Sequence, residues 1–156
     1  MATVYEDTMN QIAVLAKAIP GIGDDRVFVG FKRFNDTENF EDMVTGLEPY
    51  TQGYFLFELA EIEHQQLETA LFRFVGSLHF YAPKDTSNTL ASAWALANAL
   101  SYSLSLRANY ESAGLTVLPR RISCKLYDVE TISAKGAGAF DFGRWNSGGM
   151  EFLTCG

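Results

Sequence analysis

Two aromatic segments set the architecture of this chain: YFLFELAEI at residues 54–62 and LFRFVGSLHFY at residues 71–81. In both, apolar side chains recur at every second position for several residues, which is the period of a β-strand. The residues that this alternation places on one face are Phe55, Phe57 and Leu59 in the first segment and Phe72, Phe74 and Leu78 in the second. The polar residues 63–68 are few enough for a hairpin loop, so we predict that the two strands pair antiparallel and that Pro83 ends the second.

Helical patterns lie on both sides of this hairpin. Residues 5–19 carry apolar side chains at steps of three and four, which predicts an amphipathic helix that Pro20 stops. Residues 87–109 predict a longer helix that Gly114 terminates. Trp94 falls on the apolar stripe of this longer helix, and we therefore expect it in the core.

The remaining patterns are extended. Residues 26–33 alternate as a strand, and two further strands, 115–118 and 121–129, are expected on either side of Pro119. The carboxy-terminal part reads as a second hairpin, with strands at 139–145 and 150–154 joined by the turn-rich sequence NSGG. We predict one α+β domain over residues 1–156: a single mixed, mainly antiparallel sheet with two helices packed on one face, and an irregular acidic loop at 35–53.

Composition excludes several classes of protein. The formal net charge of -7 argues against general affinity for nucleic acid, which depends on cations that neutralise phosphates. No apolar run approaches the roughly 18 residues of a membrane helix, and residues 1–9 carry acids instead of a basic leader, so we expect a soluble, unexported protein. Cys124 and Cys155 form no framework, which favours a reducing compartment and leaves a late bridge between them open.

Charge is unevenly distributed along the chain. Between Phe34 and Phe72 there are nine acidic residues and no Lys or Arg, whereas three basic residues gather near position 120. Acidic and basic faces of two copies would attract each other, in a salt-sensitive way. Trp145 beside Arg144, at the expected hairpin tip, has two interpretations: a second kind of anchor, since Trp and Arg dominate binding hot spots, or a side chain that caps the sheet. The interface candidates are Asp36, Glu38, Glu41, Asp42, Glu48, Arg120, Arg121, Lys125, Arg144 and Trp145.

Motifs for chemistry are weak. His64 and His79 stand alone in the sequence without metal-ligand spacing, and neither cysteine lies in a nucleophile signature. We therefore predict no enzyme, with no catalytic, cofactor-binding or metal-binding residue. A solvated loop is the simplest interpretation of the acids at 36–68, although an acid–base pair or a Mg²⁺ site among them stays open.

The order of elements, the size and the acidic character resemble the tail terminator, or tail-completion, proteins of tailed bacteriophages. The resemblance rests on the helix from Tyr5, the sheet around residues 54–81, the long helix from Ser87 and the closing strands. It implies a structural virion protein without cofactor, assembled in the host cytoplasm, whose copies form a ring, usually a hexamer.

The resemblance also implies the partners of such a ring. They are the tail tube, the sheath subunits if the tail is contractile, and a head connector or neck protein. DNA would pass through the channel without specific binding, and an acidic lining would keep it from adhering. Two alternatives remain: another neck or tail tube subunit, or a small-molecule-binding domain or enzyme with a cleft around His79.

Overall fold

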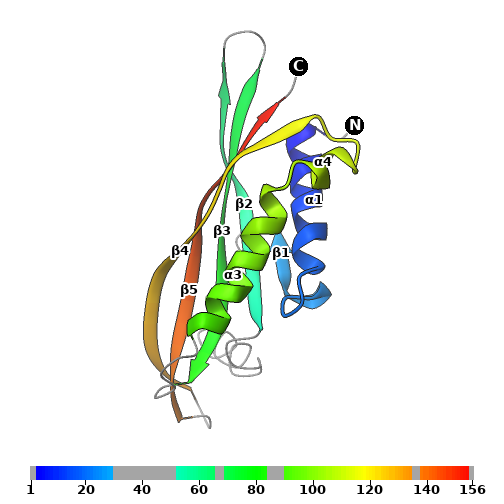
Figure 1. Cartoon of the computed structure of the whole chain (residues 1–156). Helices are drawn as coiled ribbons and strands as arrows, with labels where there is room; N and C mark the ends of the chain where they lie inside the picture. The colour runs from blue at the N-terminus through cyan, green and yellow to red at the C-terminus, as the bar shows by residue number, and fades with distance from the viewer. Residues whose placement is uncertain (1–2, 30–51, 66–68, 84–89, 135–137, 155–156) are drawn as a thin grey trace.

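The structure is a computed structural model that describes residues 3–29, 52–65, 69–83, 90–134 and 138–154; within these, side chains are described except at 80–83, 90–93, 125–134, 138–149 and 154. Its elements are α1 (Val4–Lys17), the 3-10 helix η1 (Asp24–Arg26), β1 (Val27–Val29), β2 (Gly53–His64), β3 (Ala70–Pro83), α3 (Leu90–Ser105), α4 (Ala108–Glu111), β4 (Val117–Ala134) and β5 (Gly138–Thr154). The strands form one sheet in the order β1-β2-β3-β5-β4, and α1 and α3 lie on one side of it (Figure 1).

Pairing in the sheet is mixed but mainly antiparallel. β1 pairs parallel with β2, whereas the β2–β3, β3–β5 and β5–β4 pairs are antiparallel. The predicted α+β class with one mixed sheet is therefore confirmed. The predicted β2–β3 hairpin is confirmed as well, and in it Phe57 is opposite Gly76 and Leu59 is opposite Phe74.

The first helix follows from local sequence. Thr3 and Glu6 form a capping box, in which the Thr3 side chain accepts from the Glu6 amide and the Glu6 side chain accepts from the Thr3 amide. Lys17 stands in the last turn, where a cation interacts favourably with the helix dipole. The inward face of α1, centred on Ile12 and Ala16, is fully buried against the sheet.

The core is a layer of aromatic rings between the helices and the sheet. Phe72 and Phe152 stack with ring centroids 5.6 Å apart, and Phe74 meets both at steep angles. The helices add the ring of Tyr110 and the side chains of Leu100 and Leu104 to this layer. The alternation read from the sequence thus sets the buried face of β2 and β3.

The long helix predicted to reach Asn109 ends at Ser105, and a separate short helix, α4, follows. Two side chains beyond the break donate hydrogen bonds to carbonyl oxygens in the last turn of α3. Asn109 Nδ2 donates to the Ser103 carbonyl at 2.6 Å, and the Tyr110 hydroxyl donates to the Leu104 carbonyl at 2.6 Å. The last carbonyls of a helix have no partner inside it, so these bonds stabilise the break. Gly114 was predicted to end the long helix, but α3 already ends at Ser105; with φ 77°, Gly114 follows α4 instead.

The predicted carboxy-terminal hairpin is wrong, because residues 138–154 form one continuous strand, β5, that lies between β3 and β4. The turn-rich segment becomes an irregularity of the ladder. From Asn146 to Met150, β5 advances four positions while β3 advances only three, from Ser77 back to Phe74. A strand held on both sides absorbs such an extra residue as a β-bulge and does not turn back.

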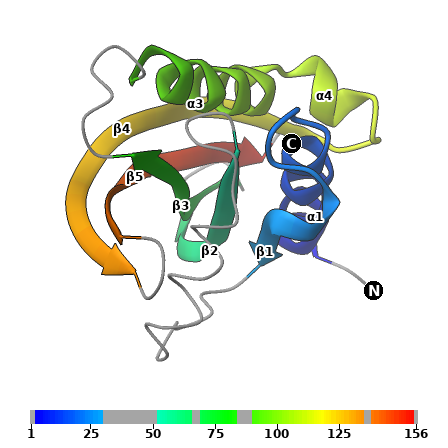
Figure 2. The same ribbon diagram turned by 90° about the horizontal axis from the view of Figure 1, so that it is seen from below.

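Pro119 likewise does not separate two strands, since β4 runs unbroken from Val117 to Ala134. β4 is an edge strand of the described sheet, so the missing amide of Pro119 is tolerated there. Its pairing with β5 shifts register three times, between Pro119 and Arg121, Ser123 and Lys125, and Leu126 and Asp128. Bulges increase local bend and twist, and Figure 2 shows β4 bending strongly, with its first part running along α3.

Candidate functional site

The acidic interface candidates Asp36, Glu38, Glu41, Asp42 and Glu48 lie outside the described residues, and so does most of the predicted loop at 35–53. Arg120 and Arg121 are exposed on β4. The backbone of Lys125 lies on the same strand opposite Asn146, whereas its side chain is outside the described part.

Arg144 and Trp145 were predicted at a hairpin tip, and that position is wrong. Both lie in β5, the strand between β3 and β4, where Trp145 is opposite Leu78 on one side and Leu126 on the other. Arg144 is opposite His79 and Asp128. Their backbone is therefore paired on both sides, although their side chains are not among those described.

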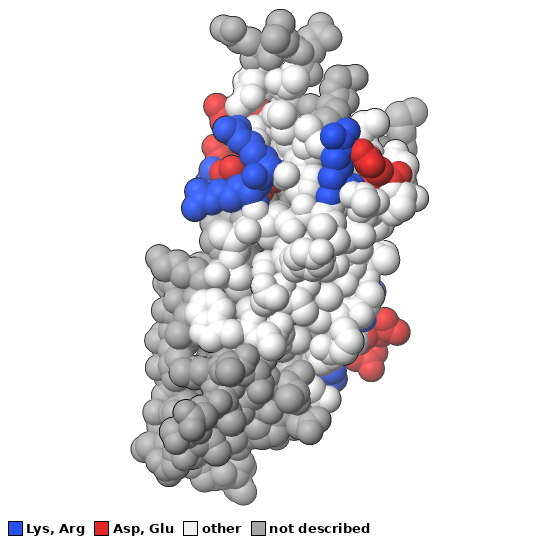
Figure 3. Space-filling model, viewed as in Figure 1, with Lys and Arg blue, Asp and Glu red and all other residues white. Residues whose placement is uncertain are grey.

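The outer face of α3 exposes aromatic side chains on a helix without charge. No residue from Leu90 to Ser105 is Asp, Glu, Lys or Arg. Trp94, Asn98 and Tyr102, four residues apart, form what we call the outer α3 face; Trp94 is 46% exposed and Tyr102 is 63% exposed. Figure 3 shows this side of the molecule, where an uncharged area lies between groups of charged side chains.

The exposure of Trp94 contradicts its predicted place in the core. Among the described side chains of α3, those buried against the sheet are Leu96, Ala97, Leu100 and Leu104. A helix without charged residues gives little contrast from which to choose its inward face. The packing of the leucines against the sheet makes that choice, and it turns Trp94 outward.

Four charged residues on four different strands form a row across the sheet. Glu61 on β2 is opposite Arg73 on β3, Arg73 is opposite Glu151 on β5, and Glu151 is opposite Arg121 on β4. The Arg73 guanidinium is 3.5 Å from the Glu61 carboxylate and 2.9 Å from the Glu151 carboxylate. Signs therefore alternate across the sheet, and we call Glu61, Arg73, Glu151 and Arg121 the charge row.

The charge row lies on the sheet face away from the helices. Phe72 directly precedes Arg73 in the sequence, and Phe152 directly follows Glu151. Both rings point toward the helices: Phe72 meets Tyr5 of α1, and Phe152 meets Tyr110 of α4. Consecutive strand residues point to opposite faces, so the charged side chains project on the other side. Sequence reasoning missed this row because its members are brought together only by strand register.

Ser77 and His79 bring a hydroxyl close to an imidazole: Ser77 Oγ and His79 Nε2 are 2.8 Å apart. This distance suits a nucleophile and its base. Access is limited, since His79 is only 8% exposed and Ser77 is partly buried. A substrate would have to displace this packing, so the arrangement favours a structural hydrogen bond within β3.

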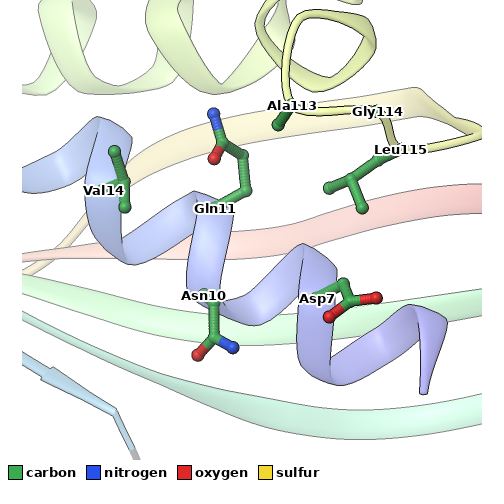
Figure 4. Close-up of a pocket in the computed structure, with 7 residues that line it drawn as sticks. All are labelled: Asp7, Asn10, Gln11, Val14, Ala113, Gly114 and Leu115. Carbon is green, nitrogen blue, oxygen red and sulfur yellow. The ribbon is translucent and has the colours of Figure 1, made fainter. Parts of the chain in front are cut away.

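An open groove of about 340 Å³ lies between α1 and the chain that follows α4. Figure 4 shows its lining: Asp7, Asn10, Gln11, Val14, Ala113, Gly114 and Leu115. Gln11 Nε2 donates to the carbonyl oxygen of Asn109 at 2.9 Å, which ties α1 to α4. Asp7 is the one titratable residue that lines the groove, so the groove lacks a pair of residues for acid–base chemistry.

Two side chains, those of Cys124 and Tyr110, have raised pKa values. Burial raises the pKa of Cys124 to about 11, so its thiol is neutral near pH 7, and burial also raises the pKa of the Tyr110 hydroxyl.

Among the described residues, no three or more His, Cys, Asp and Glu side chains form a cluster that could bind a metal ion. Nor does any helix in that part of the chain have the length and apolar character needed to cross a bilayer.

Comparison with protein-family models and with curated proteins finds no match to this chain.

Proposed function

We propose that this chain is a structural subunit that assembles with copies of itself into a ring, and that the ring completes the tail of a tailed bacteriophage. In this role the chain works through its surfaces, without catalysis or a cofactor. The ring would contact the tail tube on one side and a head connector or neck protein on the other, within the virion.

The observation that carries the proposal is the outer α3 face. Trp94 and Tyr102 expose large aromatic surfaces on a helix that has no charged residue. Exposed apolar patches bordered by polar residues mark sites of protein contact, and Trp and Tyr are enriched at the centres of such contacts. We assign this face to the contact with a neighbouring protein of the assembly.

The fold supports the same proposal. In the described part of the chain the sheet ends in the strands β1 and β4, and the edges of the sheet offer places for contacts between subunits. The order of the elements resembles that of tail terminators. This resemblance is the reason why we propose a ring at the end of a tail tube and not another kind of assembly. Closed rings use heterologous contacts, in which two different surfaces of one subunit meet.

The test is to measure the mass of the purified chain by native mass spectrometry and light scattering over a range of concentrations, together with negative-stain imaging. We expect closed rings of uniform subunit number. A chain that stays monomeric at every concentration, at low as well as physiological salt, would contradict the proposal.

The position in the virion needs a second measurement. Addition of the purified ring to tail tubes assembled from the tube protein of the same phage should place one ring at a tube end and stop further growth. Rings that instead stack into tubes by themselves would favour the alternative of a tube subunit.

A further inference from the structure

The described sheet has two unpaired strand edges at the level of the charge row. β1 pairs with β2 only at Phe55, Leu56 and Phe57, so no described strand accompanies β2 from Glu58 to His64. On the other side, β4 has β5 as its one described neighbour. Every residue from Ala60 to Gln65, at this end of β2, is exposed.

These two edges carry opposite charge. Glu61 ends the charge row on β2, and Glu63 stands exposed two residues further along that edge. Arg121 ends the row on β4, and Arg120, at the register shift, stands exposed beside it. The acidic end and the basic end of the row thus lie at opposite edges of one sheet.

We propose that neighbouring copies of this chain meet edge to edge, with the β4 edge at Arg120 and Arg121 of one copy against the β2 edge at Glu61 and Glu63 of the next. The proposal rests on the ring of the proposed function and identifies its copy-to-copy contact. The occupant of each edge is a second copy of this chain, because each edge carries the charge that the other lacks.

The alternation of the charge row selects a head-to-tail contact. With copies in the same orientation, the sequence Glu61, Arg73, Glu151, Arg121 continues into the Glu61 of the next copy, and every neighbour has the opposite sign. A two-fold contact centred on the charge row would place Arg121 against Arg121 between two β4 edges, and Glu61 against Glu61 between two β2 edges. Like charges directly opposite each other are destabilising, so these dimers are disfavoured.

Strand direction is compatible with this contact. β2, β3, β5 and β4 alternate in direction, so β4 of one copy runs antiparallel to β2 of the next copy in the same orientation. The register shift at Arg120 and the missing amide of Pro119 interrupt a continuous backbone ladder on β4. The charged side chains therefore supply much of the specificity, and the contact should weaken as salt rises.

The experiment is a charge swap between two variants of the full chain. Glu61→Arg places like charges at the contact from the acidic side, and Arg121→Glu does so from the basic side. We expect each variant alone to associate about tenfold more weakly or worse, and to be mainly monomeric where the wild type forms rings. An equimolar mixture should reassemble, since every contact then joins opposite charges again. Mass by light scattering reports both results.

Matched controls carry the same change of charge away from the charge row. Asp25→Arg changes an exposed residue of η1, and Lys17→Glu changes an exposed residue at the end of α1. Both should form rings as the wild type does. Circular dichroism and thermal unfolding identify any variant that fails to fold because it loses partners inside the charge row.

A second pair of variants leaves the ion pairs inside the charge row intact. Glu63 is opposite Leu71 and Arg120 stands at the register shift, so neither is opposite a charged residue within its own sheet. Glu63→Lys and Arg120→Glu should also lose rings singly and regain them as a mixture. Folded single variants that still form rings, or folded variants whose mixtures stay monomeric, overturn the edge contact. A monomeric wild type overturns the proposed function instead, so the two failures are distinguishable.

Discussion

The hydroxyl group of Tyr110 donates a hydrogen bond of 2.6 Å to the carbonyl oxygen of Leu104 in the protein interior. Tyr110 has no exposed surface, and its ring meets Phe152 with centroids 5.2 Å apart at 72°. The Tyr110 side chain therefore satisfies a carbonyl at the end of α3 and also packs on β5, a strand that is paired on both sides. This explains why the helix breaks where it does.

Tyr110→Phe should lower the free energy of unfolding by about 1–3 kcal/mol, because the Leu104 carbonyl would be left buried without its partner. Chemical denaturation measures the change. Tyr102→Phe is the matched control, since Tyr102 is 63% exposed and its replacement should have little effect. Equal stability of the two variants would show that the buried bond does not matter.

Phe152→Ala should lower the free energy of unfolding by about 3–5 kcal/mol, the range for removing a large buried ring. Phe152 has no exposed surface and meets the rings of Phe72, Phe74 and Tyr110. Phe152→Leu keeps most of the volume and should cost clearly less. A loss no larger for alanine than for leucine would mean that these rings do not form the centre of the core.

Gly76→Ala should be more destabilising than Gly114→Ala. A Cβ at Gly76 would lie 2.9 Å from the carbonyl oxygen of Leu56 on the paired strand, and backbone atoms there have no room to move. A Cβ at Gly114 meets nothing within 4 Å, so the cost there is only that of its φ of +77°, about 1 kcal/mol. Thermal unfolding of the two variants gives the order, and the reverse order would contradict the close approach at Gly76.

Leu100→Ala and Trp94→Ser together test which way α3 faces. Leu100 is 2% exposed, and its truncation should cost about 2–5 kcal/mol. Trp94 is 46% exposed, so we expect its replacement to cost about 1 kcal/mol or less. Denaturant titrations of both variants measure the loss in free energy of unfolding. A larger loss for Trp94→Ser than for Leu100→Ala would mean that Trp94 belongs to the core.

Cys124 should react slowly with iodoacetamide in the folded protein. Burial raises its pKa to about 11, so at pH 8 few molecules carry the reactive thiolate. Because the thiol ionises at a lower pH in the unfolded chain, stability is also lost as pH rises from the unfolded pKa toward 11. A Cys155→Ser background restricts labelling to Cys124, and the labelling rate should rise with pH and on denaturation. Rapid labelling at pH 8 without unfolding would contradict the burial.

Local pattern was sufficient for parts of this fold. The alternation of Phe55 and Phe57, and of Phe72 and Phe74, predicted two strands and their buried face, because side-chain direction along a strand has a period of two. The short polar connection between them predicted their antiparallel pairing. The steps of three and four after Tyr5 predicted α1 for the same kind of reason. The turn-rich residues 146–149 misled the prediction, since local turn chemistry was overridden by pairing on both sides of β5.

The arrangement of the candidate surfaces came only from tertiary packing. Sequence could list Glu61 and Arg121 as an acid and a base, but not place them at the two ends of one row. Arg73 and Glu151 meet because Phe72 and Phe152 stack in the core and thereby align β3 with β5. The inward side of α3 was likewise chosen by the fit of its leucines against the sheet. Contacts between residues far apart in the chain depend on such packing, which no local pattern encodes.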